Sequence, residues 1–137
     1  MDNRPDWDSY WLDVAKAISA RADCTRRKVG CVIVDRHNRV VSTGYNGGPP
    51  KGKSCLKGEC PRGKSNVDPG SSYDTGPGSC VALHAEFNAL LWADVSRVEG
   101  ATVYITDSPC GGCSKLLEGL PLAGVLWPTG SWYRGNG

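Results

Sequence analysis

The chain has 137 residues, of which 39% are hydrophobic and 22% charged, and its formal net charge is +2. This length suits one domain with one hydrophobic core, and so mild a charge does not demand a nucleic-acid partner. We therefore expect a single domain over residues 1–137, with long turns indicated by its 18 glycines and 9 prolines.

The start of the chain, residues 1–6, lacks the charged and apolar pattern of a secretory leader. No apolar run approaches the roughly 20 residues that span a bilayer. We therefore expect no membrane partner and a cytoplasmic location, where cysteines stay reduced.

A first helix is predicted next, with Asp6 or Asp8 as its cap and an end near residue 23. Apolar residues recur along it at helical spacing and predict one buried face. That face consists of Trp11, Val14, Ala15, Ile18 and Ala22.

An antiparallel hairpin follows, with one strand over residues 28–35 and a second over 39–44. Cys31 lies inside the first strand, where a cysteine acts as a small apolar residue. His37 lies in the turn, and we expect it to be solvated.

The segment 45–79 reads as irregular, because it is rich in turn residues and almost free of aliphatic ones. So long a loop is unusual inside a compact domain. Something must therefore hold this segment in place, or it is disordered.

The second half of the chain reads as a helix followed by a β-α-β unit. The predicted elements are a helix over 80–94, a strand over 102–106, a helix over 110–119 and a strand over 124–127. The two strands should be parallel and joined by a right-handed crossover. The whole is expected to be an α/β fold, a mixed sheet with helices packed on it.

Two motifs on these helices carry the chemistry, His84-Ala85-Glu86 and Pro109-Cys110-Gly111-Gly112-Cys113. A catalytic zinc takes about three protein ligands and keeps a position for water. His84, Cys110 and Cys113 supply three ligands, which leaves Glu86 free as a proton carrier.

The spacing fits if each motif begins a helix. His84 and Glu86 are two residues apart and point in different directions, whereas Cys110 and Cys113 share a face. A helix N-terminus also favours thiolates. Alone, Cys-x-x-Cys would also suit a redox pair or half of a structural zinc site, and the two motifs together would also suit a zinc module without catalysis.

Four further cysteines remain once Cys31 and the Cys-x-x-Cys pair are set aside. They are Cys24, Cys55, Cys60 and Cys80. A second, structural zinc on these four would keep the irregular segment ordered. Disulfides, which a reducing compartment disfavours, and free thiols are the alternatives.

Four segments together resemble the deoxycytidylate (dCMP) deaminase family of the cytidine deaminase superfamily. They are residues 28–34, 44–49, 84–90 and 109–113, and they extend over most of the chain. The H-x-E…P-C-x-x-C pattern is the signature of zinc nucleobase deaminases, and Gly44-Tyr45-Asn46-Gly47-Gly48-Pro49 narrows the match to the dCMP branch. The resemblance implies a three-layer α/β/α fold around a mixed sheet.

The resemblance also implies a reaction, the zinc-dependent conversion of dCMP to dUMP and ammonia, which feeds thymidylate (dTMP) synthesis. Glu86 would carry protons from a zinc-activated water to the ring nitrogen and the departing ammonia. The backbone N–H of Ala85 would hold the pyrimidine carbonyl. Similar proteins include homo-oligomers activated by dCTP and inhibited by dTTP, and some carry a second, structural zinc.

Substrate contacts are assigned to four side chains. Asn46 is expected to contact the sugar, or alternatively to make a left-handed turn with Gly47. Arg26 and Lys28 are expected near the 5′-phosphate, or alternatively form a solvated basic patch. Tyr133 resembles the start of a family segment near the nucleotide.

Rival functions stay open at this point. The motifs do not distinguish dCMP from dCTP or from 5-methyl- and 5-hydroxymethyl-dCMP. A nucleic-acid deaminase would require a basic groove with stacking aromatics, against which the charge of +2 argues. A two-zinc interaction module would have no use for Glu86.

Overall fold

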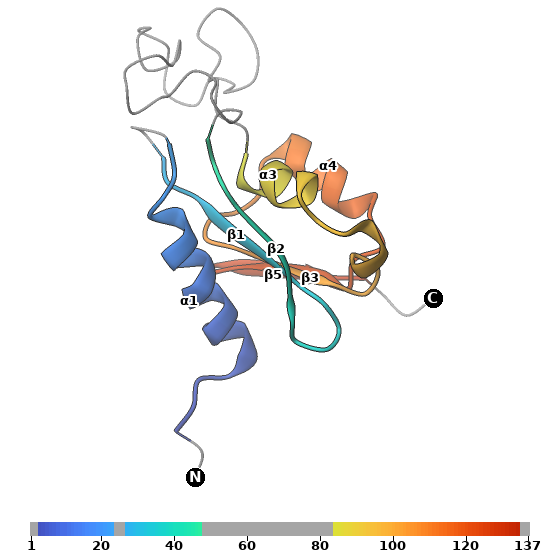
Figure 1. Cartoon of the computed structure of the whole chain (residues 1–137), viewed down its shortest axis with the longest axis horizontal. Helices are drawn as coiled ribbons and strands as arrows, with labels where there is room; N and C mark the ends of the chain where they lie inside the picture. The colour runs from blue at the N-terminus through green and yellow to red at the C-terminus, as the bar shows by residue number, and fades with distance from the viewer. Residues whose placement is uncertain (1–2, 24–26, 48–83, 135–137) are drawn as a thin grey trace, which may run out of the picture.

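The computed structural model describes residues 3–23, 27–47 and 84–134. Five strands form one sheet in the order β2-β1-β3-β4-β5, with helices on both faces (Figure 1). The strands are β1 (Gly30–Val34), β2 (Val40–Tyr45), β3 (Thr102–Ile105), β4 (Gly124–Trp127) and β5 (Gly130–Tyr133). The helices are α1 (Trp7–Ser19), α3 (Ala85–Leu91), the 3₁₀ turn η1 (Val95–Arg97) and α4 (Gly111–Glu118).

The sheet is mixed. β1 pairs antiparallel with β2 on one side and with β3 on the other, β3 pairs parallel with β4, and β4 pairs antiparallel with β5. The predicted hairpin and the predicted parallel β-α-β unit are both confirmed.

Alternate residues of the strands enter two separate cores. Cys31, Ile33 and Val103 face α3 and α4, whereas Val32, Val34 and Tyr104 face α1. This alternation is what a strand buried on both faces requires. The result is the three-layer α/β/α arrangement expected from the family resemblance.

α1 begins where the sequence indicates. The side chain of Asp6 accepts a hydrogen bond from the backbone N–H of Ser9 at 2.7 Å and caps the helix. The helix ends at Ser19, short of the predicted residue 23, because the next backbone N–H groups bond three residues back. Ala22 is buried all the same.

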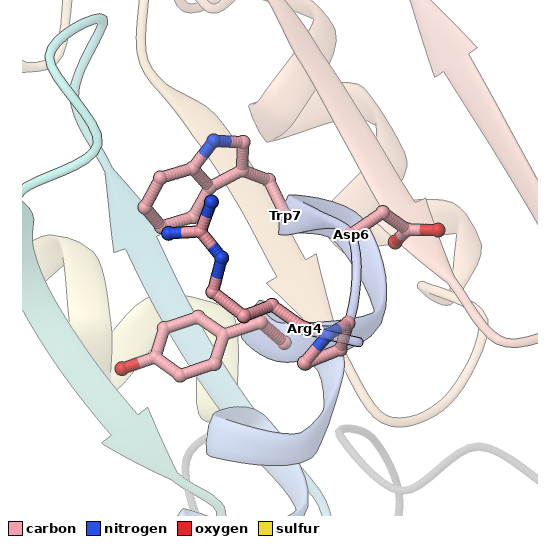
Figure 2. A pocket seen from close by; sticks show the side chains of 5 residues that line it. Arg4, Asp6 and Trp7 are labelled. Carbon is pink, nitrogen blue, oxygen red and sulfur yellow. The ribbon is translucent and has the colours of Figure 1, made fainter. Parts of the chain in front are cut away.

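A surface hollow lies at the start of α1. It has a volume of about 590 Å³ and is lined by Arg4, Pro5, Asp6, Trp7 and Tyr10. Figure 2 shows the guanidinium of Arg4 beside the ring of Trp7, with Asp6 pointing away. Because α1 has 13 residues, this hollow is about 20 Å from the other end of the helix.

The backbones of the sheet and helices approach closely at two glycines. A Cβ on Gly30 would overlap the carbonyl oxygen of Ala15 and come 2.6 Å from the nitrogen of Ser19, both on α1. A Cβ on Gly44 would overlap Ala85 and Ala89 of α3. Each face of the sheet therefore has one helix seated directly on a strand.

Two further elements differ from the sequence expectation. The helix predicted over 80–94 is α3 in the described part, ending at Leu91, and Asp94 then caps η1 through the N–H of Ser96. β5 is not predicted at all, because it has only four residues and follows a Pro128-Thr129 turn that carries no hairpin signal.

The expected boundaries in the middle of the chain are tested only in part. Tyr45 closes β2, so the irregular segment does not begin there. The expected zinc-held loop lies outside the described residues from residue 48 onward. In the described part of the chain, no helix combines the length and apolarity needed to cross a bilayer.

Candidate active site

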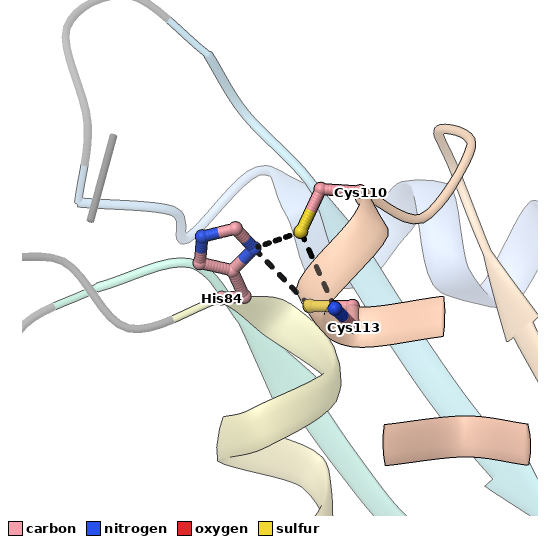
Figure 3. Close-up of side chains that lie close together, drawn as sticks. All are labelled: His84, Cys110 and Cys113. Atoms are coloured by element: carbon pink, nitrogen blue, oxygen red, sulfur yellow. Dashed lines mark hydrogen bonds between the residues drawn. The ribbon is translucent and has the colours of Figure 1, made fainter. Parts of the chain in front are cut away.

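Three side chains from the two predicted motifs meet at one point (Figure 3). The Nδ1 atom of His84 lies 3.6 Å from the Sγ atom of Cys110 and 3.2 Å from that of Cys113. We call this set of His84, Cys110 and Cys113 the His–Cys–Cys group. The structure therefore brings together side chains that are 26 and 29 residues apart in the chain.

Two helix starts position the group. His84 is the residue before α3 and Cys110 is the residue before α4. The two helices therefore begin at the same place. The Sγ atom of Cys110 accepts a hydrogen bond from the backbone N–H of Cys113 at 3.4 Å and caps α4. The buried Cys113 lies in the first turn, on the same face as Cys110.

The group has the dimensions of a zinc site. Zinc bonds of about 2.3 Å to sulfur and about 2.0–2.1 Å to nitrogen, at tetrahedral angles, separate nitrogen from sulfur by about 3.6 Å. The three ligand atoms of the group all lie within 4.8 Å of one another. Burial, followed by the charge of Glu86, raises the pKa of the Cys113 thiol, so a cation is needed to hold this cysteine as a thiolate.

Glu86 is the one charged residue buried in the described part of the chain, with 3% of its surface exposed. It lies in the first turn of α3, close enough to Cys113 for its charge to help raise the pKa of that thiol. It does not belong to the His–Cys–Cys group. The charge of Glu86 also reaches Cys31, whose pKa is raised mainly by complete burial.

Asn46 lies at the end of β2 and is 8% exposed. Its Oδ1 atom accepts a hydrogen bond from the N–H of Val29 at 2.8 Å, and its Nδ2 atom donates to the carbonyl of Arg27 at 2.7 Å. Asn38 is the only non-glycine residue with positive φ among those described, so Asn46 does not make the alternative left-handed turn. Half of its four hydrogen-bonding positions are engaged by the backbone.

Sequence reasoning missed two residues at this end of the sheet. Arg27 forms an ion pair with Asp107 at 3.2 Å, on the loop that leads to Cys110. Asn88 of α3 donates from Nδ2 to the carbonyls of Tyr45 at 2.7 Å and of Gly47 at 3.4 Å. Arg27 belongs to the basic run that includes Arg26 and Lys28, so that run was the available signal.

The remaining expected site residues are not gathered here. Lys28 is exposed beside Arg27. Tyr133 pairs with Gly124, at the end of the parallel strands opposite to Cys110, so the structure does not bring it to the His–Cys–Cys group of its own chain. Arg26 and the four cysteines Cys24, Cys55, Cys60 and Cys80 lie outside the described residues.

Comparison with known proteins agrees with this geometry. Residues 5–126 match the family described as the cytidine and deoxycytidylate deaminase zinc-binding region. The chain therefore belongs to this family of zinc-binding nucleotide deaminases. Its metal is zinc.

Within that family, named relatives are deoxycytidylate deaminases. The enzyme of Mycobacterium phage D29 is 46% identical over 130 residues, which cover 94% of this chain and 99% of the relative. The enzyme of Schizosaccharomyces pombe is 43% identical over 92% of this chain, which spans only 38% of that longer relative. A crystal structure of dCMP deaminase from cyanophage S-TIM5, in complex with dCMP and dUMP, superimposes with a TM-score of 0.67 at 25% identity over 92% of this chain and 83% of that one.

Proposed function

We propose that this protein hydrolyses dCMP to dUMP and ammonia and thereby feeds thymidylate synthesis. The observation that carries the proposal is the His–Cys–Cys group beside a buried, non-ligating carboxylate. The D29 phage relative, which is similar along almost its full length, supports dCMP as the substrate.

His84, Cys110 and Cys113 would hold the catalytic zinc. The donor set of one imidazole and two thiolates suits this ion, and three protein ligands leave one position for water. When bound there, zinc supplies the acidity that makes water a nucleophile near neutral pH.

Glu86 would move the protons. Its carboxylate takes a proton from the water and gives it to the ring nitrogen next to the amino-bearing carbon, which makes that carbon electrophilic. The oxygen of the deprotonated water bonds to that carbon, and Glu86 takes the remaining proton from this oxygen. As the bond from carbon to nitrogen breaks, Glu86 delivers this second proton to the departing ammonia. Water thus supplies the oxygen of the product carbonyl and both protons, and Glu86 is regenerated. Its 3% exposure keeps bulk water from competing.

The chain offers further groups for binding the nucleotide. The N–H of Ala85 is in the first turn of α3 and has no intrahelical partner, so it suits the pyrimidine carbonyl. Asn46 has two hydrogen-bonding positions left for the sugar. For the 5′-phosphate, we add Arg27 to Arg26 and Lys28, because its ion pair with Asp107 holds a guanidinium beside the metal-ligand loop.

Ammonia release with a substrate panel tests the proposal. Purified protein is given dCMP, dCTP, 5-methyl-dCMP and 5-hydroxymethyl-dCMP, with Glu86→Gln as the matched control. We expect dCMP to be preferred and the control to lose about 10²–10⁴-fold in kcat. Preference for another member of the panel would change the substrate and keep the mechanism. A zinc-loaded protein that turns over none of them would favour the rival interaction module.

A second zinc on Cys24, Cys55, Cys60 and Cys80 remains part of the proposal. Zinc analysis should then give two ions per chain, and Cys60→Ser should lose about one of them together with thermal stability. Unchanged zinc content in this variant would remove the second site. A homo-oligomeric state and regulation by dCTP and dTTP are proposed from the family resemblance alone. A cytoplasmic location stays a proposal from the sequence pattern.

A further inference from the structure

Two asparagines link the metal-ligand helix to the strand end beside it. Asn88 lies on α3 one turn after His84, and its backbone N–H donates to the carbonyl of His84 at 3.0 Å. Its side-chain Nδ2 donates to the carbonyls of Tyr45 and Gly47, the two residues that flank Asn46. The helix that carries His84 and Glu86 is therefore tied to the end of β2 by a side chain.

Asn46 extends this link away from α3. Its amide clamps the backbone of Arg27 and Val29 on both sides of Lys28, and its own N–H donates to the carbonyl of Val29 at 3.2 Å. The two sets of hydrogen bonds are linked, because Asn88 holds the neighbours of Asn46 and Asn46 in turn holds the 27–29 segment. This segment and Asn46 carry the groups proposed to bind the sugar and phosphate.

Next to these hydrogen bonds, the backbones of β2 and α3 are in direct contact, and this contact leaves the position of the strand along the helix easy to shift. At Gly44, the strand lies so close to α3 that there is no space for a Cβ against Ala85 and Ala89. A strand that rests directly on the helix backbone has no side chain between the two to fix its position along the helix. The hydrogen bonds of Asn88 are directional, so they fix the position of the strand that the backbone contact leaves unfixed.

We infer that Asn88 is a positioning residue that fixes the nucleotide-holding segments, 27–29 and 45–47, relative to Glu86 and the His–Cys–Cys group. The inference rests on the proposed function, since it concerns how that nucleotide is placed. Asn88 acts through the backbone of Tyr45 and Gly47 and not by touching the reacting atoms. The site requires the hydrogen bonds that the Asn88 side chain donates, and not the volume of that side chain.

Two variants of similar size test this requirement. Asn88→Leu removes both donor bonds without adding charge, and Asn88→Asp turns a carboxylate toward two carbonyl oxygens. Leu122→Ala is the control, because it removes buried apolar volume in the connection from α4 to β4, and β1 and β3 separate β4 from β2 in the sheet. Each variant is measured for zinc content, thermal stability, and kcat and KM with dCMP.

We expect both Asn88 variants to keep zinc at the wild-type level and to lose about 10–100-fold in kcat/KM, mainly through KM. Leu122→Ala should lose stability while its folded fraction keeps the wild-type KM. KM values for the Asn88 variants no higher than that of the control would overturn the inference. Loss of zinc would also overturn it, since Asn88 would then support the ligand helix itself.

Amide hydrogen exchange gives a readout that does not need turnover. Exchange at residues 27–29 and 45–47 should accelerate in both Asn88 variants and stay unchanged in Leu122→Ala. If the wild-type protein did not deaminate dCMP, the proposed function would fail while this measurement still decided the role of Asn88. Unchanged exchange at both segments would refute that role.

Discussion

The helices on the two faces of the sheet contribute differently to the fold and to the candidate active site. α1 covers one face through Trp11 and Ala15 and contributes nothing to the His–Cys–Cys group. α3 and α4 cover the other face through Ala85, Ala89 and Leu117, and the residues that start these helices carry the group. Burial on one face holds the sheet, and burial on the other also aligns reactive side chains.

The two faces also differ in how their helices are divided. α1 has 13 residues, whereas α3 has 7 and α4 has 8. Beside these short helices lies an apolar groove of about 600 Å³, with Leu91 67% and Val95 84% exposed at its rim. Short helices suit the site because only their first turns are needed there.

Among the substitutions that distinguish the two faces of the sheet, Cys113→Ala is expected to have the largest effect on activity. Substitutions beyond the metal ligands already cost about 10–100-fold in metal affinity or activity, so loss of a ligand should cost more than about 100-fold in kcat/KM. Metal analysis should show one zinc fewer per chain. A variant that retained that zinc and its activity would exclude Cys113 as a ligand.

A matched pair of glycine substitutions sharpens the comparison. Gly30→Ala forces β1 against α1, and Gly44→Ala forces β2 against α3. Each should cost about 1–3 kcal/mol of unfolding free energy, because backbone atoms must move. Only Gly44→Ala should also lower kcat per folded molecule, since α3 carries Glu86. Equal kcat values for the two variants would show that the faces are not separate in function.

The smallest effect is expected at Asp35, which ties the β1–β2 turn to η1. A hydrogen bond from Arg97 at 2.9 Å is the main reason that the pKa of Asp35 falls from 3.8 to about 2. Because the folded pKa is the lower one, this stabilisation is present above about pH 4 and is lost as the pH falls toward 2. Melting temperatures over this range should fall less steeply in Asp35→Asn than in the wild type. Parallel curves would contradict this.

Local patterns in the sequence predict much of this fold. Apolar alternation and caps place α1, β1, β2, β3, α4 and β4 to within a few residues, and the spacing of His84, Cys110 and Cys113 predicts that they meet. β5 escapes prediction because Trp132 and Tyr133 follow a turn without a hairpin signal. Asn88 escapes because its role depends on two backbone carbonyls 41 and 43 residues away.

The placement of β1 between β2 and β3 has a consequence during synthesis. Its five residues, Gly30–Val34, are all buried and nearly all apolar. β2 is made next and protects one edge, but the other edge stays open until Thr102–Ile105 leaves the ribosome. At about 5–20 residues per second this takes several seconds. During that time, nascent chains on neighbouring ribosomes expose the same unpaired, aggregation-prone strand edge. The yield of native protein should therefore depend on translation rate and on chaperones that shield this strand.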